Sequence, residues 1–252
     1  MIGVSCPGFC AADPEETWEA VSKHFGHWEI FSEARHSVDL WSERFLEARG
    51  GYDMTYSVHA PICDVNIASL SDRLREAAIL EMFVAMDHAA AMGARTVTVH
   101  PGLRSFAVEG VEARSAELAR LSLKTISRAA AQYGVAVAVE NMPQVPVMLG
   151  RTPEELGALV DGTDVGICFD IGHANTAGCI DGFLDAFGDR IANVHIHDND
   201  GDRDAHLAIG EGSIDFAKAL SRLKGYSGDY IIESRSLESA IRSKAALEKL
   251  LG

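Results

Sequence analysis

Eight short apolar runs recur along the chain, and longer stretches with helical spacing separate them. Short apolar or alternating runs predict strands, whereas apolar residues that recur every three or four positions predict helices. An alternation of this kind predicts an α/β fold built on a parallel sheet. We expect the strands at residues 2–5, 28–31, 55–59, 96–100, 135–140, 165–170, 192–197 and 230–233.

Local signals mark where several helices begin and end. Gly93 and Gly134 follow two long helical stretches, and glycine readily adopts the left-handed conformation that ends a helix. Asp13-Pro14 and Thr152-Pro153 each provide an N-cap residue followed by the proline that suits a first helical turn. Ser213 is expected to cap the penultimate helix.

The number of β-α units distinguishes a closed barrel from an open doubly wound sheet. Eight such units in 252 residues match the (β/α)8 barrel. The residues after the first predicted strand, Cys6-Pro7-Gly8-Phe9, lack the GxGxxG pattern of dinucleotide-binding open sheets. No low-complexity tract or proline-rich linker interrupts the series. We therefore predict a single (β/α)8 TIM barrel and one domain spanning residues 1–252.

Charge and cysteine usage restrict the partners and the compartment. The net charge is −15, with 37 acidic against 22 basic residues, which disfavours a nucleic-acid partner without excluding one. Five cysteines form no CxxC pair, which favours reduced thiols and a cytoplasmic protein. No stretch reaches the ~18 apolar residues of a membrane span, and no secretion signal is visible, so no membrane partner is expected.

Histidines and carboxylates end six predicted strands, at the place where the active-site mouth of a barrel forms. Buried carboxylates without compensation are costly, and a metal cation is the usual compensation. One such residue could be a satisfied core group, but six favour a metal site. Imidazole and carboxylate ligands without thiolate suit Mn, Zn, Fe, Co or Mg. The six residues are His59, His100, Glu140, Asp170, His195 and Glu233.

More polar residues follow the sixth and seventh predicted strands. His173 lies in the turn after Asp170, and His206 follows the acidic segment that begins at Asp198. This segment resembles the start of a calcium loop, but position 209 is Ile where such a loop requires Glu, so calcium is not expected. A solvated acidic loop explains the aspartates of this segment better than it explains His206.

Several other side chains are assigned more general positions. Glu33, Trp41 and Phe106 are candidates for pocket walls, although each is also compatible with a purely structural role. Four histidines in or near predicted helices are expected to face solvent: His24, His27, His36 and His88.

Three segments of the chain resemble the xylose-isomerase-like barrel superfamily, which contains sugar isomerases, tagatose-type epimerases and endonuclease IV. They are Glu140-Asn141-Met142-Pro143, residues 169–173, and His195-Ile196-His197-Asp198 with Gly210-Glu211-Gly212. The resemblance to the sugar enzymes implies one divalent metal on Glu140, Asp170, His195 and Glu233. It also implies that the two glutamates are the acid and base of proton transfer through a metal-stabilised enediolate. The substrate-binding residues would be His59, His100, His173 and His206.

Endonuclease IV is the alternative within the same superfamily, as a zinc phosphodiesterase that acts on abasic DNA. The resemblance implies nine ligands for up to three zinc ions, which adds His59, His100, His173, Asp204 and His206 to the first four. The segment Ala60-Pro61-Ile62-Cys63 replaces the aromatic wedge with which that nuclease enters DNA, and the loop around Arg35 is short. We therefore expect a sugar or sugar-phosphate isomerase or epimerase with a small carbohydrate substrate. A non-catalytic binding barrel is a third hypothesis, disfavoured by the complete ligand set.

Overall fold

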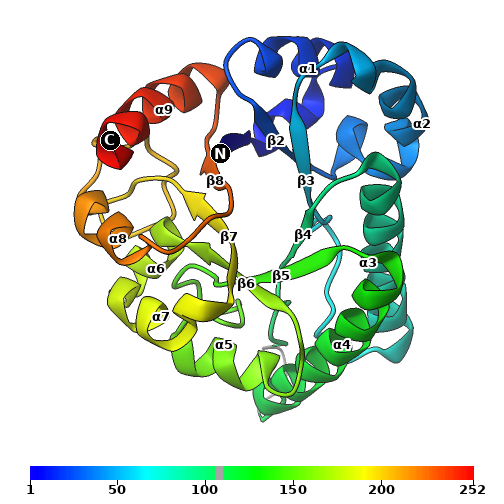
Figure 1. Cartoon of the computed structure of the whole chain (residues 1–252). Coiled ribbons are helices and arrows are strands. Elements are labelled where there is room, and N and C mark those ends of the chain that lie inside the picture. Colours follow the sequence, from blue (N-terminus) through cyan, green and yellow to red (C-terminus); the bar gives the residue numbers. More distant parts are fainter. Residues whose placement is uncertain (106–109) are drawn as a thin grey trace.

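The computed structural model describes residues 1–105 and 110–252, and eight parallel strands close into a barrel in chain order (Figure 1). The first and last strands pair in register from Ile2 with Tyr230 to Ser5 with Glu233, which closes the barrel. This architecture confirms the predicted single (β/α)8 TIM barrel. The strands are β1 (Ile2–Ser5), β2 (His27–Phe31), β3 (Thr55–His59), β4 (Thr96–Val99), β5 (Ala136–Glu140), β6 (Gly166–Asp170), β7 (Ile191–Ile196) and β8 (Tyr230–Glu233).

An outer ring of helices surrounds the strands (Figure 1). Two helices, α6 and α7, follow β6, and the other helices alternate with the strands. In the described part of the chain, no helix has both the length and the apolar character needed to cross a membrane. The helices are α1 (Pro14–Ser22), α2 (Val38–Ala48), α3 (Asp72–Met92), α4 (Glu112–Tyr133), α5 (Pro153–Val160), α6 (Ile171–Thr176), α7 (Ile180–Phe187), α8 (Phe216–Arg222) and α9 (Leu237–Leu251).

Most of the predicted helix boundaries are confirmed. Gly93 and Gly134 end α3 and α4 with φ angles of 75° and 72°, in the left-handed region that favours glycine. The side chains of Asp13 and Thr152 cap α1 and α5.

The prediction for α8 is wrong. Asp215, not Ser213, caps this helix, and its carboxylate accepts a hydrogen bond from the amide of Lys218. Ser213 instead donates its own amide to the carbonyl oxygen of Asn199, which fixes the loop before the helix.

Aromatic side chains fill the space between α1, α2 and the barrel. Trp18 stacks on Phe45, with ring centroids 4.6 Å apart, and meets Trp41 edge to face. Trp41 is therefore part of the buried core, so the structural role is the one that applies among the two considered for it.

Two histidines expected in solvent are buried. His27 lies in β2, where its ring nitrogens contact the hydroxyls of Thr55 and Ser57 at 2.8 and 2.9 Å. His36 is 1% exposed, and its ring meets Trp28 edge to face. The sequence does not reveal this burial of His27, because a strand that is buried on both faces shows no alternation of polar and apolar residues. His36 lies in a tight turn, where no such periodic pattern exists.

Candidate functional site

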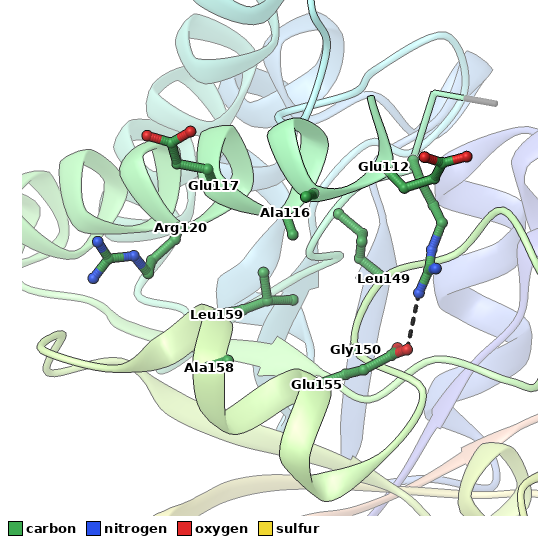
Figure 2. A pocket seen from close by; sticks show the side chains of 11 residues that line it. Glu112, Ala116, Glu117, Arg120, Leu149, Gly150, Glu155, Ala158 and Leu159 are labelled. Carbon is green, nitrogen blue, oxygen red and sulfur yellow. Dashed lines mark hydrogen bonds and ion pairs between the residues drawn. The ribbon is translucent and has the colours of Figure 1, made fainter. Parts of the chain in front are cut away.

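A cavity on the outer layer of the barrel contains none of the predicted site residues. It encloses about 440 Å³ between α4 and α5 and is lined by Ala116, Leu149 and Leu159 among others (Figure 2). Arg104 and Glu155 form an ion pair of 2.9 Å at its edge. The side chains that offer metal-binding atoms gather instead at the carboxyl ends of the strands.

Five of these side chains stand on the last residue of a strand or one residue before its end. Parallel strands bring their carboxyl ends to one mouth of the barrel, and Asp170 of β6 lies in register with His195 of β7. All five are at most 5% exposed. They are His59 on β3, Glu140 on β5, Asp170 on β6, His195 on β7 and Glu233 on β8.

One group of four donors centres on His195. Its Nδ1 atom lies 3.2 Å from Glu140 Oε1, 3.1 Å from Glu233 Oε1 and 4.0 Å from Asp170 Oδ2. The donor atoms of these four residues lie within 4.8 Å of one another. Asp170 Oδ2 is buried and has no hydrogen-bond partner among the described residues. Three buried carboxylates around one imidazole fit a divalent cation, which would offset most of their negative charge and bind the free oxygen.

The carboxylate of Glu140 also faces a second pair of histidines. Its Oε2 atom lies 3.3 Å from His59 Nε2 and 3.0 Å from His100 Nε2, while Oε1 faces His195. Burial alone would lower the pKa of both histidines, because it favours the neutral imidazole. For His59 the nearby Glu140 outweighs burial and raises the pKa, whereas for His100 burial prevails. Glu140 can therefore bridge two neighbouring ligand positions.

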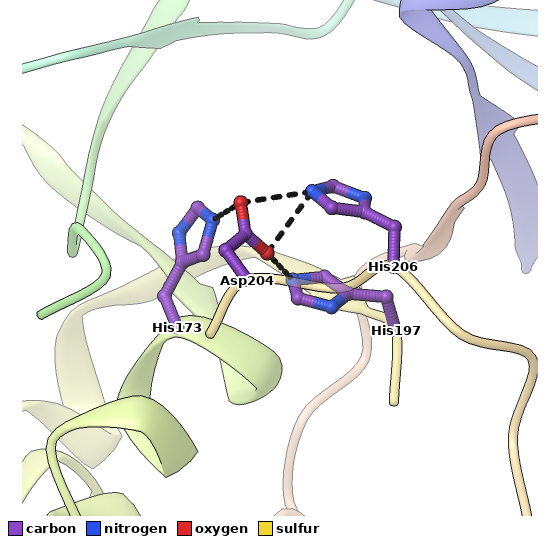
Figure 3. Close-up of side chains that lie close together, drawn as sticks. All are labelled: His173, His197, Asp204 and His206. Atoms are coloured by element: carbon purple, nitrogen blue, oxygen red, sulfur yellow. Dashed lines mark hydrogen bonds and ion pairs between the residues drawn. The ribbon is translucent and has the colours of Figure 1, made fainter. Parts of the chain in front are cut away.

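A third group joins His173 of α6, His197 after β7, and Asp204 and His206 of the following loop (Figure 3). Asp204 Oδ2 lies 3.5 Å from His173 Nε2 and 3.2 Å from His206 Nε2. Its other oxygen, Oδ1, lies 3.4 Å from His197 Nε2. Burial raises the pKa of Asp204, but hydrogen bonds from His173 and His206 outweigh it and hold the pKa far below its usual range.

Glu29 is a buried acid beneath the mouth that sequence reasoning missed. Its Oε1 lies 2.7 Å from His195 Nε2, and Ser57 and Asn193 donate hydrogen bonds of 2.9 and 2.7 Å to Oε2. Burial raises its pKa, but His195, His59 and the Ser57 hydroxyl outweigh that effect and hold the pKa at about 2. The sequence signal for Glu29 is a lone acid in the middle of an otherwise apolar strand.

The structure brings all nine predicted ligands to one mouth. It also places His197 there, a residue to which the sequence assigned no role. Glu33 lies at the rim, where its carboxylate accepts hydrogen bonds from the amides of Ile62 and Cys63. Phe106, the remaining candidate for a pocket wall, lies outside the described residues.

Hollows reach the mouth from two sides. An apolar one of about 150 Å³ borders His100 and is lined by Ile62, Leu103 and Met148 among others. Another of about 340 Å³ borders His206 and carries Arg203 and Arg235. The site can therefore be approached over His100 and over His206, whose side chains are 23% and 14% exposed.

A family model described as the xylose isomerase-like TIM barrel matches residues 17–250, so the chain belongs to this family. The uncharacterized protein MJ1311 of Methanocaldococcus jannaschii is 36% identical over 260 residues, covering 99% of this chain and 89% of the relative. A crystal structure of a D-tagatose 3-epimerase-like protein superposes with a TM-score of 0.93 at 35% identity, over 99% of this chain and 96% of that one. A probable endonuclease 4 of Staphylococcus saprophyticus is 30% identical over 178 residues, which span 63% of this chain and 58% of the relative.

Proposed function

We propose that this chain is a divalent-metal-dependent isomerase or epimerase of a sugar or sugar phosphate. The observation that carries the proposal is the meeting of two buried glutamates, from different strands, at one imidazole nitrogen. Glu140 and Glu233 lie 3.2 and 3.1 Å from His195 Nδ1, and they come from β5 and β8. The likeness to a D-tagatose 3-epimerase-like structure supports the same class of reaction.

Metal binding, proton transfer and substrate binding can be assigned to different residues of the mouth. Glu140, Asp170, His195 and Glu233 would hold the metal, which when bound stabilises negative charge on adjacent substrate oxygens. Glu140 and Glu233 stand on different walls, so one can remove the proton beside the carbonyl while the other returns it. The imidazoles of His59, His100, His173 and His206 would bind substrate hydroxyls. His100 and His206 are the most exposed of these four.

Solvent deuterium exchange tests the proposal. The protein is incubated in D2O with a panel of ketoses and hydroxy-ketones and, in turn, Mn, Zn, Co, Fe or Mg ions. We expect deuterium at the carbon beside the carbonyl of at least one ketose. Glu140→Gln and Glu233→Gln should each slow this exchange at least about 100-fold, the usual contribution of an acid or base. Glu117→Gln, at an exposed position on α4, is the control and should match the wild type.

Two results would count against the isomerase. One is the absence of exchange with every ketose and every metal, and the other is full exchange in both glutamine variants. Either result would leave the mouth without the proton transfer that the two glutamates are proposed to perform.

A zinc phosphodiesterase acting on abasic DNA is the second candidate. It is favoured by the assembly of all nine nuclease-like ligands and by the relative described as a probable endonuclease 4. The net charge of −15 and the segment Ala60-Pro61-Ile62-Cys63 favour the isomerase instead. Incubation of the zinc-loaded protein with an abasic duplex separates the two, since only a nuclease nicks the strand at the abasic position.

We also propose that the chain functions as one domain, spanning residues 1–252, in the cytoplasm. Its five cysteines are free thiols, and two of them, Cys63 and Cys179, are at least partly exposed. Free exposed thiols fit a reducing compartment.

A further inference from the structure

The outer face of α3 carries a straight stripe of five exposed side chains. They recur at intervals of four, three, four and three residues, so they lie along one line on the helix. The helix stands in the outer ring, and its opposite face packs against the barrel (Figure 1). The five residues that form this α3 stripe are Arg73, Ala77, Leu80, Val84 and Asp87.

The middle of the α3 stripe is apolar although it faces solvent. Leu80 and Val84 are 59% and 37% exposed, and Leu74, beside the stripe, is 66% exposed. The inner face of the same helix is apolar too, and its buried residues include Met82 and Met86. A surface helix normally presents a polar face to water, and a helix that is apolar on every side is normally buried. The pattern of α3 is therefore that of a helix that packs against a second surface on its outer side.

The next helix of the ring, α4, does not share this pattern. The two helices are similar in length, with 21 residues in α3 and 22 in α4. Of the residues that the structure describes in α4, one large apolar side chain is exposed, Leu121. The charged side chains of Arg114, Glu117 and Arg128 are exposed on the same helix, and the first two form an ion pair. A long helix of the outer ring thus does not need an apolar outer face, so the apolar stripe is a feature of α3 itself.

The two ends of the α3 stripe carry opposite charges. Arg73 and Asp87 have no ion-pair partner among the described residues, whereas the nearby Arg75 pairs with Asp72. A second copy of the helix, laid antiparallel about a two-fold axis near Leu80, places each Arg73 beside the partner's Asp87. A parallel arrangement would bring like charges together instead. We therefore propose that the α3 stripe joins two copies of this chain in an antiparallel, two-fold symmetric dimer.

The apolar residues of the stripe supply the affinity of this dimer, and its charged ends set the orientation. Ala77, Leu80 and Val84 of one copy would pack against the same three residues of the partner, and burial of apolar surface favours association. Charges at the rim of a contact mainly select its orientation. Glu76 and Glu81 lie beside the stripe and would stay in water at its edges. One helix from each copy buries less than the standard interface of about 1,600 Å², so the dimer should dissociate on dilution. The proposal concerns the outside of the barrel and does not depend on the isomerase reaction.

Sedimentation velocity over a range of protein concentrations tests the proposal. A reductant is present because Cys63 is an exposed thiol. At about 0.15 M salt the screening length is about 8 Å, which limits the repulsion between copies that each carry a net charge of −15. We expect the mass of the wild type to rise from that of one chain toward that of two. Leu80→Glu should raise the dissociation constant at least about 10-fold, because a two-fold contact contains the change twice. Leu40→Glu makes the same change at a leucine of α2 that is 70% exposed, and it should match the wild type.

Exchange of the two charges tests the antiparallel arrangement. Arg73→Asp brings two aspartates together at each end of the contact, and Asp87→Arg brings two arginines together, so each variant should weaken the dimer several-fold. The variant with both changes restores opposite charges and should return the dissociation constant toward that of the wild type. A wild type that remains a single chain at every concentration would overturn the proposal and would assign the α3 stripe to a different protein. A dimer that Leu80→Glu leaves intact would also overturn it, and so would a double variant that dimerises no better than the single ones.

Discussion

Glu29 and His195 are in direct contact beneath the barrel mouth, with 2.7 Å between Glu29 Oε1 and His195 Nε2. Both side chains are fully buried. The other nitrogen of the ring, Nδ1, faces Glu140 and Glu233. A carboxylate behind a histidine fixes which nitrogen carries the proton and leaves the opposite nitrogen free to bind a metal. Glu29 is therefore placed as a positioning residue for the ligand group around His195.

Replacing Glu29 by Gln should weaken metal binding at that group about 10- to 100-fold, the usual effect of losing such a partner. The neutral amide of glutamine lacks the negative charge that holds the proton on His195 Nε2. It also places an N–H donor beside the imidazole ring, where the carboxylate of Glu29 offers only acceptors. Competition with a chromophoric chelator measures the dissociation constant. Ser57→Ala is the matched variant, because it removes one hydrogen bond to Glu29 and leaves the contact with His195, so its effect should be smaller. A Glu29→Gln protein that loses stability without metal but keeps the wild-type affinity would show a structural role only.

Gly172→Ala is expected to destabilise the fold around His197. Alanine favours a helix more than glycine does by about 1 kcal/mol, so local preference alone would stabilise α6. The overlap of the new Cβ with the ring of His197 opposes this gain and should displace the imidazole. Thermal melting of the metal-free proteins measures the result, since a displaced buried side chain lowers the melting temperature. Gly26→Ala adds a Cβ that meets nothing within 4 Å and is the control. A melting temperature of Gly172→Ala that equals or exceeds that of the wild type would contradict the prediction.

The architecture was predictable because its signals are local. The apolar runs gave strand limits within about one residue, and glycine at positions 93 and 134 ended helices for a conformational reason that operates within a few residues. The gathering of the nine ligands was also predictable, because parallel strands place all their carboxyl ends at one mouth. His59 and Glu140 are far apart in sequence, and their side chains meet because both strands end at this mouth.

Side-chain surroundings were not predictable in the same way. Glu29 meets His195 across the inside of the barrel, and β2 is buried along its whole length, so its residue pattern does not show which side chains point inward. His27 and His36 were assigned to solvent because histidine is polar, yet both are buried. Whether Trp41 is a pocket wall or part of the core stayed open at the level of sequence, because its partner Trp18 comes from another helix and is not visible from local sequence.

Asp198 organises the loop between β7 and α8, which carries Asp204 and His206. Its buried carboxylate accepts hydrogen bonds from the amides of Asn199, Gly210, Gly212 and Ile214. Asp198→Ala should lower the free energy of unfolding by about 3 kcal/mol, because several buried amides lose their acceptor. Chemical denaturation measures the loss, and Asp198→Asn, which retains one acceptor oxygen, should lose less. Asp200→Ala, at an exposed position of the same loop, is the control. Equal stability of Asp198→Ala and Asp200→Ala would refute the assignment.

His36 should make the protein less stable in acid. Burial lowers the pKa of His36 from 6.5 to about 4, and the approach of Arg35 acts in the same direction, whereas a backbone hydrogen bond to Ala12 and the nearby Asp13 oppose it. Between these two pH values the unfolded chain binds a proton at His36 that the folded chain does not bind. The free energy of unfolding must therefore fall as the pH falls from 6.5 to 4.

Replacement of His36 by Phe keeps a ring beside Trp28 and removes the titration. The loss of stability from pH 6.5 to 4 should then be smaller than in the wild type by roughly 2 kcal/mol, after allowance for solvent screening. Urea unfolding of the metal-free proteins at several pH values measures this difference, and the histidines of the mouth contribute equally to both proteins. His24→Gln, at an exposed position, should follow the wild type. Parallel stability curves for His36→Phe and the wild type would show that His36 does not supply the acid sensitivity.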